Sequence, residues 1–165
     1  MTLTDLYAIL PILSLVAWAL VLMLVDLWIP RGHKGISALL SALGLVVSLV
    51  CTMLLADQKT TAFNGMVAVD GFALALDVLF IVSGLAAIAL AYNWLKRTGL
   101  ERAEYYTLLL FSISGMMLMA HAYDLIIVFL ALELLSIPLY ILAGFYRDRA
   151  ESEEASLKYF LLGAF

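Results

Sequence analysis

Three residues whose side chains ionise lie inside apolar stretches of the sequence. They are Asp77, Glu133 and Lys158. At about 1.5 Å of helical rise per residue, Glu133 lies roughly 12 Å beyond Leu125, near the middle of a bilayer about 30 Å thick. A carboxylate at that depth costs several kcal/mol unless it is paired or protonated. Glu133 is therefore the strongest candidate for a site that moves charge or protons.

The helix that carries Glu133 has one polar stripe. Ser136, Tyr140 and Gly144 follow Glu133 at i+3, i+7 and i+11, so all four share one face. This pattern predicts a stripe that faces the bundle interior or a water-filled path. Pro138 removes a backbone hydrogen bond and can open the helix beside Glu133. The structural alternative is a carboxylate that only fixes helix packing.

The other two ionisable residues have stronger structural alternatives. Lys158 is either a pathway residue or the partner of Glu154, which lies four residues before it in the favourable order for a helix ion pair. Asp77 lies about 9 Å into its helix, and we expect it to reach outward to the interface or to cap a neighbouring helix.

A direct pair between Glu133 and Lys158 is not expected. Their depths in adjacent antiparallel helices differ by about 10 Å, which is too far for a close ion pair. We therefore expect the partner of Glu133 to be a basic residue beyond Phe165.

Composition indicates an all-α, polytopic membrane protein. Of 165 residues, 65% are hydrophobic and 13% charged, and the mean hydropathy is +1.08. Five segments are long enough to span a bilayer, and a sixth begins after Ser152, the predicted N-cap. The predicted spans cover residues 6–28 (with Pro11 inside), 36–56, 71–95, 105–121 and 125–146.

The positive charges predict an orientation. They cluster in the loops after the first, third and fifth spans, whereas the loops after the second and fourth hold only Lys59. The clustered residues are Arg31, Lys34, Lys96, Arg97, Arg102, Arg147 and Arg149. The positive-inside rule then places the N-terminus outside.

Several classes of site are excluded or disfavoured by the sequence. Cys51 is the single cysteine, so no disulfide or thiolate metal site forms within the chain. The histidines, His33 and His121, are far apart in sequence, and we predict no metal site. Neither glycine-rich nucleotide motif occurs, so we expect no bound cofactor.

Four segments of this sequence resemble one family. They are Val69-Asp-Gly-Phe72, Glu104-Tyr-Tyr-Thr-Leu-Leu-Leu110, Leu132-Glu-Leu-Leu-Ser-Ile-Pro-Leu-Tyr140 and Glu154-Ala-Ser-Leu-Lys-Tyr-Phe-Leu-Leu-Gly-Ala164. Together they resemble subunit N of bacterial proton-pumping NADH:quinone oxidoreductase, respiratory complex I. The wider family includes the Mrp-type antiporter subunits.

The resemblance implies a fold of fourteen transmembrane helices with two inverted repeats of five helices. Residues 1–103 would form three leading helices, and residues 104–165 would begin the first repeat. We therefore expect the chain to be the N-terminal piece of a longer polypeptide. The fifth-helix glutamate of the family matches Glu133, and its sixth-helix lysine matches Lys158.

The same resemblance implies a function. The chain would be a membrane-arm subunit of a translocase in the bacterial inner membrane, and would take part in proton translocation coupled to electron transfer from NADH to quinone. Its partners would be other membrane-arm subunits and the lipid bilayer, with no nucleic acid. NADH, FMN, iron–sulfur clusters and quinone would be bound by other subunits, with no redox centre in this chain. The alternatives are an Mrp-type sodium/proton antiporter subunit and a structural subunit that transports nothing.

Overall fold

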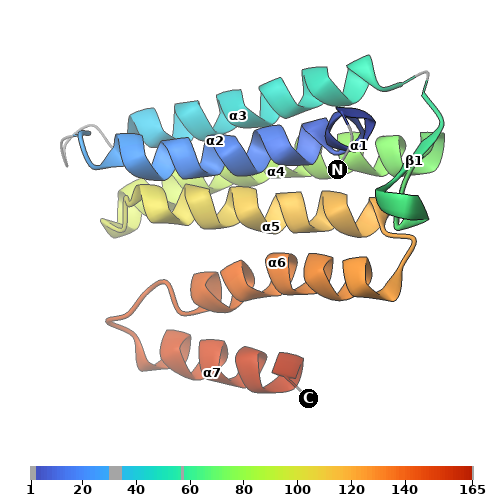
Figure 1. Ribbon diagram of the computed structural model, residues 1–165. Coiled ribbons are helices and arrows are strands. Elements are labelled where there is room, and N and C mark those ends of the chain that lie inside the picture. The colour runs from blue at the N-terminus through green and yellow to red at the C-terminus, as the bar shows by residue number, and fades with distance from the viewer. Residues whose placement is uncertain (1–2, 30–34, 57, 165) are drawn as a thin grey trace.

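The protein is a bundle of antiparallel helices with one small hairpin (Figure 1). The computed structural model describes residues 3–29, 35–56 and 58–164. Its helices are α1 (Leu3–Ala8), α2 (Leu10–Asp26), α3 (Gly35–Leu54), α4 (Gly71–Thr98), α5 (Ala103–His121), α6 (Leu125–Ala143) and α7 (Ala150–Ala164). Between α3 and α4 lie β1 (Thr60–Ala62), the 3-10 turn η2 (Phe63–Gly65) and β2 (Val67–Val69). The predicted all-α class is confirmed.

Four of the helices are long and apolar enough to cross a membrane. They are α3, α4, α5 and α6, and each lies within a few residues of a predicted span. A shorter apolar helix, α2, has 17 residues, which is about 25 Å of helix.

The prediction of one continuous first helix over residues 6–28 was wrong. The chain breaks at Ile9, whose ψ of 11° is not helical, and α2 begins at Leu10. Pro11 stands in the first turn of α2. Proline has no backbone N–H to donate to the preceding turn, so it is tolerated where a helix starts and disfavoured inside one.

The predicted N-cap at Ser152 was also wrong. Helix α7 already begins at Ala150, so Ser152 lies in its first turn. The Ser152 hydroxyl instead donates to the carbonyl of Ala143, the last residue of α6, at 2.8 Å. This hydrogen bond satisfies the Ala143 carbonyl, which has no partner within its own helix.

The hairpin was predicted only as a loop. Its strands pair antiparallel, with Thr60 opposite Val69 and Ala62 opposite Val67. Strands of three residues are too short to give a recognisable alternation of apolar and polar side chains. Several contacts attach the hairpin to the helices. Val67 forms a bridge with Ala122, the N–H of Tyr123 donates to the Met66 carbonyl at 2.9 Å, and Asp5 of α1 accepts from the backbone N–H of Phe63 at 3.0 Å.

The two ends of the bundle differ in their number of basic residues. The α4–α5 and α6–α7 connections meet at the end opposite the hairpin (Figure 1). These connections and the last turn of α4 carry Lys96, Arg97, Arg102, Arg147 and Arg149, whereas Lys59 adjoins the hairpin. The fold therefore gathers the described basic residues as the predicted orientation requires. Arg31, His33 and Lys34 lie outside the described residues.

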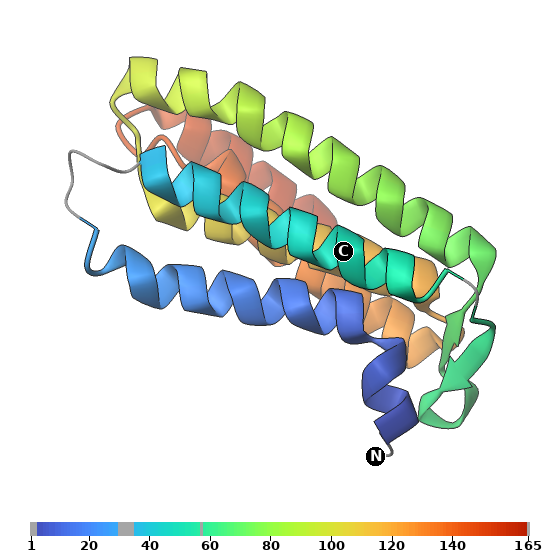
Figure 2. The same ribbon diagram turned by 90° about the horizontal axis from the view of Figure 1, so that it is seen from above.

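The core lies among α2, α3, α4 and α5. Fully buried side chains from each of these helices meet there, including Leu15, Leu45, Ile81 and Leu110. Helices α6 and α7 lie beyond α5 and outside this core (Figures 1 and 2). In α6 only Ala131 and Pro138 are buried among the described residues. Most of the α6 surface is therefore apolar and exposed, as suits contact with lipid or other protein.

One glycine sets the distance between α5 and α6. A Cβ atom placed on Gly115 would collide with the backbone of Leu134 and Leu135. This contact lies directly after Glu133 in α6, so Gly115 fixes the position of the segment that carries the carboxylate.

We therefore expect Gly115→Ala to lower the free energy of unfolding by about 1–3 kcal/mol, because the backbone of α6 must shift to admit the methyl group. Unfolding in mixed detergent micelles measures the change. Gly71→Ala is the matched control, since a Cβ at Gly71 meets nothing within 4 Å. Equal stability of the two variants would contradict the close contact.

Candidate functional site

Glu133 lies in the middle of α6, between its two ends at Leu125 and Ala143. Its side chain is half-buried. Within the part of the chain that the structure describes, no side chain or backbone group forms a hydrogen bond or ion pair with it. Glu133 thus remains a carboxylate in an apolar helix without a partner among the described residues.

The polar stripe beyond Glu133 contacts α7. The Ser156 hydroxyl donates to the Tyr140 carbonyl at 2.7 Å, and Gly144 lies against the Ser156 side chain. The Tyr140 ring packs edge-on against Tyr159, with 4.9 Å between ring centroids. The far half of the stripe therefore joins two helices, whereas Glu133 and Ser136 lie on the part of α6 before this contact.

Pro138 lies between these two parts and is buried. Helix α6 continues through it from Leu125 to Ala143 without a break. The missing N–H of Pro138 leaves one backbone carbonyl of the preceding turn without its helical partner.

Lys158 forms the predicted ion pair with Glu154. Lys158 Nζ lies 2.5 Å from Glu154 Oε1, and the two side chains are 68% and 64% exposed. No contact joins Lys158 to Glu133 among the described residues. The pair is of the i, i+4 type, which stabilises a helix by a few tenths of a kcal/mol.

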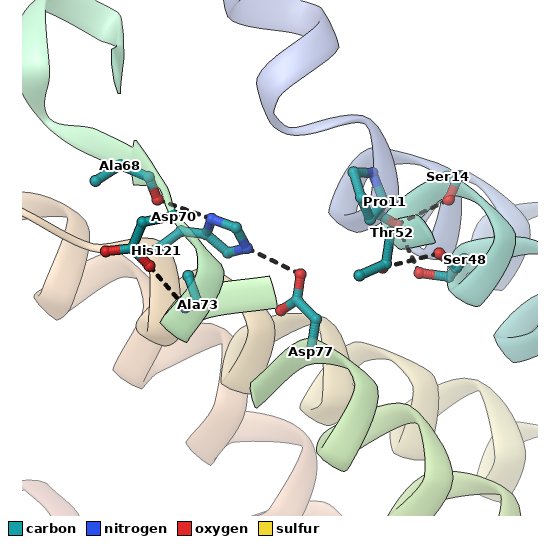
Figure 3. Close-up of polar contacts among 9 residues, drawn as sticks. All are labelled: Pro11, Ser14, Ser48, Thr52, Ala68, Asp70, Ala73, Asp77 and His121. Atoms are coloured by element: carbon teal, nitrogen blue, oxygen red, sulfur yellow. Dashed lines mark hydrogen bonds and ion pairs between the residues drawn. The ribbon is translucent and has the colours of Figure 1, made fainter. Parts of the chain in front are cut away.

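The prediction that Asp77 reaches outward or caps a neighbouring helix was wrong. Asp77 is fully buried, and its Oδ2 lies 2.9 Å from Nε2 of His121, which is 2% exposed (Figure 3). Asp70 fills the capping role at this end, accepting from the N–H of Ala73 at 2.8 Å. Helices α4 and α5 are antiparallel neighbours, so the second turn of α4 lies opposite the last turn of α5.

The hydrogen bond of the other ring nitrogen, Nδ1, determines which nitrogen atoms of His121 carry a proton. His121 Nδ1 lies 2.9 Å from the carbonyl oxygen of Ala68 in β2. A carbonyl oxygen only accepts hydrogen bonds, so Nδ1 carries a proton and donates it. One further proton then lies between His121 Nε2 and Asp77 Oδ2. The other carboxyl oxygen, Oδ1, is buried and has no hydrogen-bond partner.

Sequence reasoning missed His121 because it treated histidines only as metal ligands. The sequence offered only a weak signal: Asp77 lies inside an apolar helix, and His121 is the last residue of another, 44 residues away. The described residues contain no group of three or more His, Cys, Asp or Glu placed to hold a metal ion.

The sequence of this chain is similar to those of known membrane proteins. The family model for the transmembrane region of NADH:quinone oxidoreductase and Mrp antiporters matches residues 122–165. NADH-quinone oxidoreductase subunit N of Chloroflexus aggregans is 45% identical over 98% of this chain and 33% of the relative. Subunit N 2 of Roseiflexus castenholzii is 44% identical over 90% of this chain and 30% of its own. Over nearly its whole length, the chain is therefore similar to about a third of these subunit N proteins.

A solved structure agrees with this relationship. A chain of respiratory complex I from Thermus thermophilus with bound aureothin superposes with a TM-score of 0.76 at 32% identity. The match covers 93% of this chain and 33% of that chain. The chain thus spans about a third of the length of the relatives it matches. Together with the four helices of spanning length, the similarity supports a multi-pass protein of the bacterial inner membrane.

The family model separates the two groups of ionisable residues. Glu133 and Lys158 lie inside the matched range of residues 122–165, whereas Asp77 and His121 lie before it. The chain therefore carries a buried acid–base pair outside the region that this family model describes.

We expect His121→Leu to destabilise the protein by about 1–3 kcal/mol for each group that it leaves without a partner, a buried carboxyl group and a backbone carbonyl. The double variant Asp77→Leu/His121→Leu should lose less than the sum of the two single losses. The free energies of unfolding of the wild type, the two single variants and the double variant are measured in mixed micelles to complete the double-mutant cycle. Ser83→Ala is the control, since its exposed hydroxyl bonds only the Leu79 carbonyl of its own helix. Additive losses would contradict a direct interaction.

Proposed function

We propose that the chain is part of a membrane-arm subunit of a bacterial proton-pumping NADH:quinone oxidoreductase. The similarity to subunit N over nearly the whole chain carries this proposal. In it, the other membrane-arm subunits are the partners of this chain. NADH, FMN, iron–sulfur clusters and quinone are handled by other subunits, and this chain takes part in moving protons.

Glu133 is the residue that we assign to proton movement. Because Glu133 lies deep in α6, an isolated negative charge on it is costly in free energy. A nearby positive charge or a bound proton therefore stabilises this residue. An ionised Glu133 stabilises the charged form of a buried lysine beside it, and this favours loading of a proton on that lysine. Moving the two apart releases the proton. We place that lysine in a part of the subunit that this chain does not include.

Helix α7 offers a way to influence Glu133. It packs on α6 through the Ser156–Tyr140 hydrogen bond and the Tyr140–Tyr159 ring contact. Lys158 belongs to the same helix and is held by Glu154. In this proposal Lys158 tunes or relays the proton handled at Glu133 and does not pair with Glu133 directly.

Coupling to the redox reaction requires two arrangements of the charged groups. Each arrangement must be favoured by a different state of the distant quinone site. A change in the α6–α7 contact would alter the surroundings of Glu133 on one side, while Gly115 holds α6 against α5 on the other.

An Mrp-type sodium/proton antiporter subunit is the second candidate, because the description of the family model covers both groups of proteins. The relatives named as NADH-quinone oxidoreductase subunits favour the first candidate. A structural subunit that transports nothing is the third. It differs from both in requiring only that Glu133 be compatible with helix packing.

The first test replaces the carboxylate by its neutral isostere. We expect Glu133→Gln in the full-length subunit to lower proton pumping and coupled quinone reduction several-fold while the complex still assembles, because the charge that stabilises the loaded lysine is gone. Proton uptake into inverted membrane vesicles and NADH oxidation are measured together.

Glu153→Gln is the control for this test, since Glu153 is exposed in the first turn of α7. Wild-type rates for Glu133→Gln in assembled membranes would support the structural subunit. Sodium-dependent proton movement without NADH oxidation would support the antiporter.

The second test concerns Lys158. We expect Lys158→Ala to reduce pumping less than Glu133→Gln does, because Lys158 acts on the site from a distance. Glu154→Ala removes the same ion pair and leaves the lysine. Equal, wild-type activity of both variants would show that the pair is only a surface contact, worth about 0.3–0.5 kcal/mol.

A further inference from the structure

The buried pair of Asp77 and His121 has one open position. Asp77 is fully buried, His121 is 2% exposed, and Asp77 Oδ1 has no hydrogen-bond partner. A buried polar atom without a partner is rare, because it loses its bonds to water and gains none in the protein. Such an atom marks a place where a proton or a water molecule can bind.

The charge state of the pair follows from its contacts. An ionised Asp77 would place part of a negative charge on Oδ1, where no donor stabilises it. If Asp77 is protonated on Oδ2 and donates to the Nε2 of a neutral His121, the orphan oxygen is only a carbonyl. The neutral form therefore suits this site better than an ion pair.

The hairpin closes the site. Ala68 of β2 accepts the Nδ1 proton of His121, and its neighbours Val67 and Val69 are 2% and 1% exposed. Asp77 is the seventh residue of α4, about 9 Å from the first. The pair thus lies within the first two turns of α4, beside Ala68 of the hairpin (Figure 3).

Few charged groups surround the pair. The exposed carboxylate of Asp70 acts electrostatically on His121 and is itself bonded to the N–H of Ala73. From α3 come the buried hydroxyls of Ser48 and Thr52, whose protons go to backbone carbonyls.

The other ionisable side chains at this end come from the elements next to the hairpin. Asp5 of α1 and Asp124 before α6 each accept a backbone N–H, and Lys59 is exposed. Among the described residues, these groups leave the Asp77–His121 pair as the buried acid–base unit of the hairpin end.

We propose that Asp77 and His121 form a proton-exchange site at the hairpin end of the bundle, separate from Glu133. At rest the pair holds one proton between Asp77 Oδ2 and His121 Nε2. An incoming proton bonds to Asp77 Oδ1, and the proton on Oδ2 moves to Nε2. The pair then carries one positive charge. Loss of the Oδ1 proton, together with return of the Nε2 proton to Oδ2, restores the resting form. Its part in pumping rests on the proposed function, whereas its charge state does not.

The decisive variant is Asp77→Asn in the full-length subunit of the assembled complex. The asparagine amide still donates to a neutral His121 Nε2, so the hydrogen bond to α5 is kept, but no exchangeable acid remains. We expect assembly and thermal stability near those of the wild type. We expect the pumping rate to fall below about half, because a proton path that lacks one acid–base group is slowed there.

Asp124→Asn is the matched control. It removes a carboxylate at the same end of the bundle that caps α6 through the N–H of Ile126, and asparagine caps a helix as well as aspartate does. We expect pumping by this variant to equal that of the wild type.

An infrared difference spectrum between wild type and Asp77→Asn provides a second readout. We expect a carboxylic acid C=O band that shifts in heavy water and is lost in Asp77→Asn but retained in Asp124→Asn. A carboxylate band in its place would overturn the resting state assigned to the pair.

The pumping results separate two kinds of failure. If Glu133→Gln lowers pumping and Asp77→Asn does not, the exchange site is overturned and the proposed function stands. If neither variant lowers pumping in assembled complex, the proposed function itself fails.

Discussion

The absence of water around the helices is the constraint on which this structure depends. Each backbone N–H and C=O group in an apolar medium must find a partner inside the chain, and a helix provides one for nearly all of them. The backbone groups without a partner inside a helix lie at the helix ends, and in this protein side chains form hydrogen bonds with them. Ser152 pairs the last carbonyl of α6, and Asp70 and Asp124 cap the starts of α4 and α6.

The same constraint divides the ionisable side chains into two groups. Asp77 and His121 form a hydrogen bond with each other in the interior, and the hairpin provides the third group through the Ala68 carbonyl. Glu133 lies on α6, outside the core and without a partner among the described residues. A carboxylate presented in this way requires a positive charge or a proton from elsewhere.

Packing around Glu133 is asymmetric. On the α5 side the backbones come close at Gly115, and no side chain separates them. On the α7 side the contact includes two hydroxyl–carbonyl bonds, donated by Ser152 and Ser156, and aromatic edges. Close backbone contact resists displacement, whereas a contact through rotatable side chains has alternatives. The α7 side is therefore the side from which the surroundings of Glu133 can change.

The sequence alone determined the class of protein, the positions of the long helices and the unusual depth of Glu133. Those properties depend on hydropathy and on the number of residues between charged residues. Both can be read from short stretches of the sequence without knowing how the helices pack. It also led to the family, through the motifs around Glu133 and Lys158.

Only the tertiary structure decided that Asp77 is buried and bonded to His121. Whether a carboxyl group snorkels or is buried depends on what lies opposite it, and His121 comes from 44 residues away. The hairpin was likewise invisible in the sequence, because its strands of three residues are stabilised by contacts with α1 and α5 and not by their own pattern. Helical depth can be counted along a chain, but a partner in space exists only once the helices pack.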